Sequence, residues 1–174
     1  MNKQEWTDRG TAILFGDGAG AAVLECVPGE MPPMVTHSDG SMGAALTCAS
    51  PFATKEKEYV EMNGQDVFRF AVKKVPECIE ELLEKGGLDR NKIDYFILHQ
   101  ANSRIVEGIA KRLKVDLSRF PMNLSEYGNT SSATIPILLD ELNRQGTLKK
   151  GMKLIMAGFG AGLSWGASYL EWDI

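Results

Sequence analysis

Both ends of the chain carry the same pattern, in which an apolar run leads into a glycine cluster and a second apolar run follows. Near the amino end the cluster is residues 16–20, between apolar runs at residues 11–15 and 21–27. Near the carboxyl end it is residues 158–162, between residues 153–157 and 163–170. Two apolar runs around a glycine cluster predict neighbouring strands. We therefore expect the fold to begin and end with strand pairs.

A long helical pattern lies at residues 65–85, where apolar side chains recur at steps of three and four residues. Two glycines follow it and end the helix. Pro76 lies inside the pattern and lacks a backbone N–H, so we expect a kink there or two abutting helices. The preceding residues 28–51 are rich in Pro, Gly, Ser and Met, which predicts a loop with one short strand at residues 34–36.

The second half of the chain alternates short strands and helices. Strands are predicted at residues 93–98 and 120–124, and helices at residues 103–113 and 134–145. This order indicates an α/β fold in which helices pack on a mixed five-stranded sheet. No long linker divides residues 1–174, so we expect a single domain.

Composition excludes several classes of protein. With 44% hydrophobic and 24% charged residues, the chain has the composition of a folded globular domain. A net charge of −4 argues against nucleic-acid binding, which favours a basic domain. Three cysteines without CxxC spacing argue against a disulfide scaffold or a zinc ribbon. Without an apolar run of membrane-spanning length or a signal peptide, we expect a cytoplasmic protein that does not bind membranes.

Two polar side chains follow predicted strands closely. His99 ends the apolar run at residues 93–98, and Asn129 lies in a Gly-Asn-Thr-Ser-Ser turn after the run at residues 120–124. In α/β sheets ligands bind beyond the carboxyl ends of the strands, so both side chains are expected in one crevice. A neutral pair of hydrogen-bond donors there could stabilise an enolate oxygen. Position alone leaves an ordinary strand-end histidine and an ordinary turn asparagine equally open, and His37 is read as a plain loop residue.

Other candidate sites are weaker. The glycine clusters lack the third glycine and the following helix of a dinucleotide-binding motif, so they are better explained by close backbone packing. Cys26 ends a predicted strand, and Cys78 lies on the apolar stripe of the long helix. Cys48 has no neighbouring histidine in the sequence that could lower the pKa of its thiol. We therefore expect all three cysteines to be structural. With two histidines and no clustered thiols, no metal site is expected.

Four motifs occur in the order seen in the β-ketoacyl-[acyl-carrier-protein] synthase III family, which this chain resembles over nearly its whole length. They are residues 13–21, His-Gln-Ala-Asn at residues 99–102, Gly-Asn-Thr-Ser at residues 128–131, and residues 158–166. The family has a thiolase-like fold of two similar halves, with a catalytic cysteine in the first half and a histidine and asparagine in the second. This sequence resembles the second, C-terminal half only.

The resemblance implies a decarboxylative Claisen condensation, in which an acyl group from acyl-CoA is joined to malonyl-acyl carrier protein with loss of carbon dioxide. His99 and Asn129 match the pair that stabilises the enolate oxygen, and Ala161 matches the backbone oxyanion donor, where many members have glycine. Matches to the pantetheine-binding positions of coenzyme A are Gly64, Ala101, Asn102 and Phe159. Matches to the basic helix that receives the acidic carrier protein are Arg104, Lys111 and Arg112, which otherwise read as an ordinary solvated face.

The sequence departs from the family in its cysteines, none of which matches the nucleophile. We expect residues 1–174 to be the C-terminal domain of a longer enzyme, inactive alone, homodimeric at full length, and without a cofactor beyond its thioester substrates. A related acyltransferase of polyketide or secondary-metabolite synthesis and a non-catalytic module that binds carrier protein or coenzyme A remain open alternatives.

Overall fold

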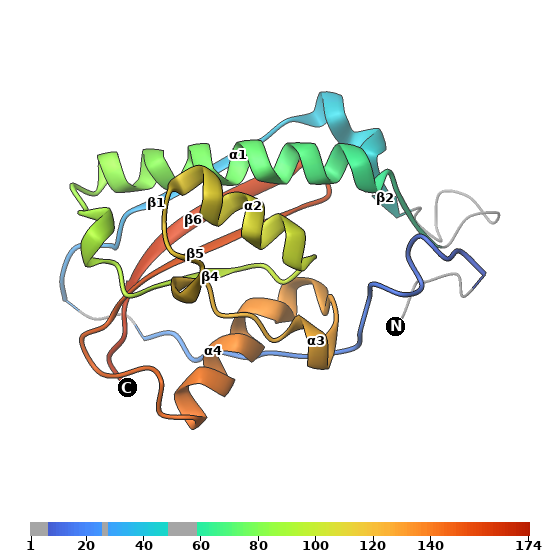
Figure 1. Cartoon of the computed structure of the whole chain (residues 1–174). Coiled ribbons are helices and arrows are strands. Elements are labelled where there is room, and N and C mark those ends of the chain that lie inside the picture. Colours follow the sequence, from blue (N-terminus) through green and yellow to red (C-terminus); the bar gives the residue numbers. More distant parts are fainter. Residues whose placement is uncertain (1–6, 26–27, 49–58) are drawn as a thin grey trace.

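The computed structural model describes residues 7–25, 28–48 and 59–174, and it shows helices on both faces of one sheet (Figure 1). In chain order the elements are β1 (Met34–Ser38), β2 (Leu46–Cys48), β3 (Val60–Met62), α1 (Gly64–Lys85), β4 (Tyr95–Leu98), α2 (Ser103–Leu113), α3 (Leu124–Tyr127), α4 (Thr134–Arg144), β5 (Lys153–Gly160) and β6 (Ser164–Glu171). Short 3-10 helices join several of them.

The main sheet of the described residues has four strands in the order β1-β6-β5-β4, and β2 pairs with β3 in a separate small sheet. β4 runs parallel to β5, while β6 is antiparallel to both β5 and β1. The predicted mixed sheet is confirmed, with four strands in place of five in the described part of the chain. Because β4 and β5 are parallel, their carboxyl ends meet at the same edge of the sheet.

Side chains of β4 alternate between two apolar layers. Phe96 and Leu98 pack with α1 and α2, whereas Ile97 between them packs with α4. These helices lie on opposite faces of the sheet (Figure 1). All three side chains are at most 1% exposed. Successive side chains of a strand point to opposite faces, so a strand covered by helices on both sides needs apolar residues throughout. This explains why residues 93–98 lack polar alternation.

The long helix α1 passes through Pro76 without a break (Figure 1), so the predicted division into two helices is wrong. Nine buried residues of α1 hold one face of the helix on the sheet, and this packing outweighs the single hydrogen bond that Pro76 lacks. At its start, the Asn63 side chain accepts a hydrogen bond from the backbone N–H of Asp66. No helix in the described ranges is long and apolar enough to cross a membrane.

The shorter helix α2 lies against α1 through a glycine contact. A Cβ at Gly108 would overlap the side chain of Val72 in α1, so only glycine permits this approach. Asn102 caps α2, since its side-chain oxygen accepts a hydrogen bond from the backbone N–H of Arg104. The predicted bounds of α2 are confirmed.

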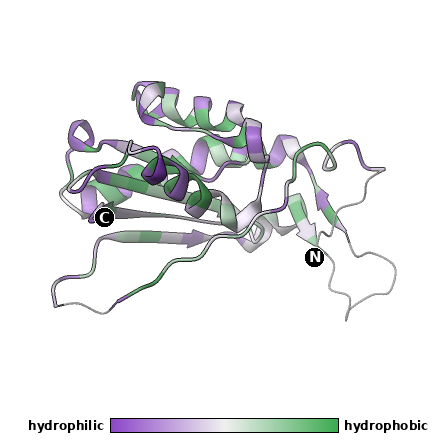
Figure 2. Cartoon of the chain, turned by 90° about the horizontal axis from the view of Figure 1, so that it is seen from below, coloured by the Kyte–Doolittle hydropathy of each residue, from purple (hydrophilic) through white to green (hydrophobic). Residues whose placement is uncertain are grey.

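The strand pair predicted near the amino end is wrong. Residues 11–15 form turns that end in one isolated bridge at Phe15, and residues 16–25 have no regular structure. Figure 2 shows hydrophobic stretches along this extended segment, which runs outside the sheet. Val23 and Leu24 are 100% and 93% exposed. A strand needs a hydrogen-bonded neighbour along its length, and the described residues supply one only at the Phe15 bridge. Cys26 and Val27 lie outside the described residues.

The strand predicted at residues 120–124 is also absent. A 3-10 helix at Leu117–Arg119 precedes this segment, and α3 begins at Leu124. The apolar character that predicted a strand has another cause, because the ring of Phe120 stacks on that of Phe96, 4.9 Å away, and is 2% exposed. A short apolar run can thus arise from a buried side chain in a segment that forms no β-strand hydrogen bonds.

Candidate active site

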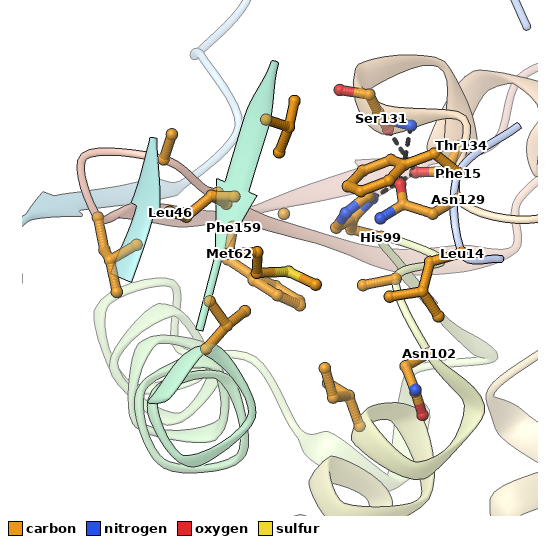
Figure 3. Close-up of a pocket in the computed structure, with 18 of the residues that line it drawn as sticks. Leu14, Phe15, Leu46, Met62, His99, Asn102, Asn129, Ser131, Thr134 and Phe159 are labelled. Atoms are coloured by element: carbon orange, nitrogen blue, oxygen red, sulfur yellow. Dashed lines mark hydrogen bonds between the residues drawn. The ribbon is translucent and has the colours of Figure 1, made fainter. Parts of the chain in front are cut away.

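A cavity of about 560 Å³ opens at the sheet edge where β4 and β5 end. This volume is in the range of small-molecule binding sites, about 300–1,000 Å³. Segments far apart in the sequence form its walls: β2 and β3, the start of α1, the residues after β4, the turn before α4, the β5–β6 turn and residues 14–15 (Figure 3). Most of the lining side chains are apolar, so the few polar groups among them decide what the cavity can bind.

His99 extends β4 into the cavity. Its backbone N–H donates to the carbonyl of Ala157 at 2.9 Å, which fixes the residue at the end of the strand pair. The imidazole contacts the ring of Phe159 edge-on, with centroids 5.2 Å apart, and its Nδ1 lies 2.6 Å from the Thr134 hydroxyl (Figure 3). Burial lowers the pKa of His99 to about 4, because desolvation disfavours the charged ring. The imidazole is therefore neutral near pH 7.

Asn129 reaches the same cavity from a tight turn. Gly128 before it adopts φ +66°, a left-handed conformation that favours glycine. The Asn129 side-chain oxygen accepts a hydrogen bond from the backbone N–H of Ser131 at 2.9 Å, within the turn (Figure 3). Since the oxygen is held in this way, the carboxamide presents its NH₂ group as a donor.

The segment before β1 holds the Asn129 turn in place. Phe15 and Asn129 form a parallel bridge: the backbone N–H of Asn129 donates to the carbonyl of Leu14 at 2.8 Å, and that of Gly16 donates to the carbonyl of Asn129 at 3.0 Å. A Cβ at Gly16 would overlap the carbonyl oxygen of Tyr127. Close backbone packing, predicted for the glycine clusters, therefore explains Gly16, although no strand junction lies there.

Together these groups form a neutral donor pair in an apolar cavity. His99 and Asn129 both line it, and desolvation keeps the imidazole uncharged. Hydrogen-bond donors fixed in a site of low polarity stabilise negative charge developing on a carbonyl oxygen more strongly than they would in water. The arrangement suits chemistry that passes through an enolate or an oxyanion.

The other residues predicted to contact substrate line the same cavity: Gly64, Ala101, Asn102, Phe159 and Ala161. The helix α1 begins at Gly64. Asn102, the cap of α2, lies at the cavity wall (Figure 3). Ala161 is exposed in the turn between β5 and β6. Sequence separation hides this grouping, but the fold collects all five around His99. Their individual roles stay predictions.

The three predicted docking residues lie outside the cavity. Arg104, Lys111 and Arg112 are exposed on α2. Among the described residues, Arg112 alone of these three forms an ion pair, with its guanidinium 3.6 Å from the carboxylate of Glu77. An exposed pair of this kind contributes little to stability. Docking of a partner at these residues stays a prediction.

Sequence reasoning missed Thr134 as a neighbour of His99. It is 3% exposed at the first position of α4, where a threonine is an ordinary helix-start residue. No sequence signal indicates its contact with a histidine 35 positions earlier. The apolar walls from Leu46, Met62 and Phe68 were missed for the same reason, because their segments carry no motif.

Of the remaining candidates, Cys78 and His37 have structural surroundings, whereas Cys48 is exposed and lines the cavity. Cys78 is 2% exposed in α1, and burial raises the pKa of its thiol to about 11, so it is a poor nucleophile. His37 lies in β1 rather than in a loop, and its Nε2 is 2.7 Å from the carboxylate of Glu81. Cys48 ends β2 at the cavity wall.

Two family models match the chain. The model described as 3-oxoacyl-[acyl-carrier-protein (ACP)] synthase III C terminal matches residues 83–172, slightly more than half of the chain. The model described as 3-oxoacyl-[acyl-carrier-protein (ACP)] synthase III matches residues 2–40.

Curated relatives carry the corresponding name. The β-ketoacyl-[acyl-carrier-protein] synthase III of Synechococcus elongatus is 46% identical over 180 residues, covering 97% of this chain and 54% of the relative. The chloroplastic synthase III B of Cuphea wrightii is 43% identical, covering 97% of this chain and 47% of the relative. The chain thus spans about half the length of the curated relatives it matches.

Solved structures share the fold. The 3-oxoacyl-[acyl-carrier-protein] synthase III of Aquifex aeolicus superimposes with a TM-score of 0.89 at 35% identity, over 98% of this chain and 54% of that one. The priming β-ketosynthase of the R1128 polyketide pathway gives 0.85 at 32% identity, over 99% and 54%. The thiolase-like α/β architecture predicted from the sequence is confirmed.

Proposed function

Since the chain belongs to the 3-oxoacyl-[acyl-carrier-protein] synthase III family, we propose that it supplies the enolate-stabilising half of a decarboxylative condensing site. The observation that carries this proposal is the placement of His99 and Asn129 in one cavity, with the imidazole kept neutral by burial. In the proposed reaction an acyl group from acyl-CoA is joined to malonyl-acyl carrier protein with loss of carbon dioxide, and no further cofactor takes part.

In this reaction, decarboxylation places negative charge on the oxygen of the malonyl thioester. The NH₂ of Asn129 and a ring N–H of His99 would donate to that oxygen. A charged imidazolium is not required, because a fixed neutral donor in an apolar site already stabilises the charge. The backbone N–H of Ala161 would donate to the oxygen of the acyl thioester in the next step.

The acyl group itself needs a thiol nucleophile, which we propose comes from residues outside this chain. Cys78 is excluded by its burial and raised pKa. None of Cys26, Cys48 and Cys78 matches the nucleophile position of the family. The chain alone would then be inactive, the intact enzyme would carry both halves, and its predicted homodimeric state and cytoplasmic location stay predictions.

Carrier-protein docking is proposed for the outer face of α2. Arg104 and Lys111 are exposed cations on a chain of net charge −4, and Asn102 connects their helix to the cavity wall. A pantetheine arm bound at Gly64, Ala101 and Phe159 would reach His99 from that side. Charged groups at such a rim act mainly on association, so their loss should weaken carrier binding rather than the chemical step.

One alternative has direct support. The polyketide priming synthase matches this chain with an overlap similar to that of the fatty-acid enzymes. The proposed enolate-stabilising groups serve both pathways, so acyl-chain choice depends on surfaces outside these residues. A non-catalytic module that binds carrier protein or coenzyme A is the other alternative, and calorimetric titration of the isolated chain with both ligands tests it: tight binding favours a module.

The decisive experiment assays carbon dioxide release from malonyl-carrier protein labelled in its free carboxyl group. The enzyme is this chain combined with, or fused to, the first half of a relative. We expect His99→Ala and Asn129→Ala each to lower the rate by roughly 10²–10³-fold, the usual cost of removing one oxyanion donor. His37→Ala, which removes the other histidine of the chain, should keep the parent rate. Parent-like rates in both cavity variants would overturn the proposal.

Docking is tested in the same assay. Lys111→Glu should raise the KM for malonyl-carrier protein while leaving kcat near the parent value. Lys149→Glu is a matched control, because Lys149 is exposed in the segment that leads into β5, at the sheet edge away from the cavity. A KM equally raised in both variants, or unchanged in Lys111→Glu, would contradict docking on α2.

A further inference from the structure

Residues 14–20 run along one side of the turn that carries Asn129. Both backbone polar groups of Asn129 pair with this segment: its N–H donates to the carbonyl of Leu14 at 2.8 Å, and its carbonyl accepts the N–H of Gly16 at 3.0 Å. The backbone of a proposed catalytic residue is therefore fixed by a segment that lies far from it in the sequence.

The same segment continues past this turn to the start of α4. A Cβ at Gly18 would lie 2.8 Å from Cδ1 of Ile137 and 2.9 Å from Cγ2 of Thr130, and a Cβ at Gly20 would overlap the ring of Pro136. Neither glycine has a positive φ, so the close approach, and not the backbone conformation, excludes a side chain. Substitution by alanine is therefore a direct probe of this contact.

The segment contacts the site but not the core. None of residues 14–20, all of which the structure describes, belongs to either apolar cluster, and the buried members of these clusters begin at Val35. The chain beneath the segment carries Asn129 and Thr134, and the Thr134 hydroxyl lies 2.6 Å from Nδ1 of His99 (Figure 3). A displaced segment would thus alter the surroundings of both proposed donors while leaving the core packing intact.

We propose that residues 14–20 set the position of Asn129 relative to His99, with Gly18 and Gly20 as positioning residues that let the segment approach the start of α4. This inference rests on the proposed function, because it assumes that both side chains donate to one substrate oxygen. Neither glycine lines the cavity. A misplacement of about 1 Å far from the reacting atoms can lower a rate by about 100-fold, so one added carbon at this contact should affect catalysis.

Amide hydrogen exchange of the chain, followed by NMR, tests the contact without catalysis. In the parent, the N–H groups of Gly16 and Asn129 should exchange slowly, because each donates across the contact. Gly18→Ala and Gly20→Ala should each raise both exchange rates by about tenfold or more, while the amides of β4 keep the parent rates. Ala22→Val is a matched control, because it adds carbon atoms at an exposed position just beyond the segment.

The carbon dioxide assay described above tests the consequence for the site. Gly18→Ala and Gly20→Ala should each lower kcat by roughly 10-fold to 100-fold, because the donor pair is misplaced. The KM for malonyl-carrier protein should stay within about threefold of the parent value, since the change affects the chemical step. Ala22→Val should keep the parent kcat.

Unchanged exchange of the Gly16 and Asn129 amides in both alanine variants would overturn the inference. Faster exchange with a parent kcat, in an enzyme that loses activity in Asn129→Ala, would also overturn it. Loss of protection throughout β4 counts against it as well, since the segment would then support the core. If His99→Ala and Asn129→Ala both keep the parent rate, the proposed function fails, while exchange still decides whether the segment holds the turn.

Discussion

Acidification should destabilise the fold through His99. The imidazole is held neutral by burial, with a pKa of about 4 in place of about 6.5. Above about pH 6.5 the ring is neutral in both the folded and the unfolded chain, so His99 adds no pH dependence. As the pH falls from about 6.5 to about 4, the unfolded chain takes up a proton that the folded chain does not, and unfolding becomes easier. Below about pH 4 both states are protonated and the loss is complete.

The magnitude follows from the two pKa values. Each pKa unit between the folded and unfolded states corresponds to 1.36 kcal/mol, so the full effect is about 3 kcal/mol. Domains of this size are usually stable by only about 5–15 kcal/mol. The loss should therefore appear as a clear drop in the denaturant midpoint.

Urea unfolding of the parent and of His99→Asn, at intervals from about pH 7.5 to about pH 4, isolates this effect. Protonation of carboxylates with lowered pKa values, such as Asp39 and Glu81, also destabilises the fold in acid. Both proteins contain these carboxylates, so their effect cancels in the comparison. The free energy of unfolding of the parent should fall relative to that of the variant by about 3 kcal/mol across this range. A difference that stays constant with pH, or a His99 ring that titrates near pH 6.5 by NMR, would refute the reasoning.

Substitutions at three further positions test two packing contacts and the cap of α1, each by urea or thermal unfolding. Phe120→Ala should cost about 3–5 kcal/mol, because it leaves a hole against Phe96; a loss below about 1 kcal/mol would show that the site collapses freely. Gly108→Ala should cost about 1–2 kcal/mol, since overlap with Val72 outweighs the better helix propensity of alanine, and a stabilised variant would contradict the close contact of α1 and α2. Asn63→Ala should cost about 1 kcal/mol through loss of the α1 cap, whereas Asn63→Ser should restore most of it.

The helices could be predicted from the sequence because the spacing of apolar side chains that identifies a helix is local. Residues 103–113 alternate apolar and polar side chains at helical spacing, and α2 has these same bounds. The predicted helix at residues 134–145 ends one residue later than α4, within the usual fraying of a helix end. β4 was readable for a related reason, since an unbroken apolar run requires cover on both faces.

Two of the strands predicted from the sequence are absent, because the sequence does not show whether a partner strand lies beside them. Residues 11–15 and 120–124 have the composition of strands, but a ladder also requires a neighbour at the right distance and register, which the sequence does not specify. The apolar ring of Phe120 stacks on the ring of Phe96 instead. Pro76 is the converse case, in which a local signal for a break is overridden by the packing of α1.

For the site, residue type and a place at the end of a strand singled out His99. The strand expected before Asn129 is absent, so only its turn motif and the family resemblance pointed to this residue. Three properties required the tertiary structure: the contact of His99 with Thr134, the support of the Asn129 turn by Leu14 and Gly16, and the desolvation that keeps the imidazole neutral. Periodicity is a property of neighbours along the chain, whereas protonation and hydrogen-bond direction depend on neighbours in space, and those exist only once the chain has folded.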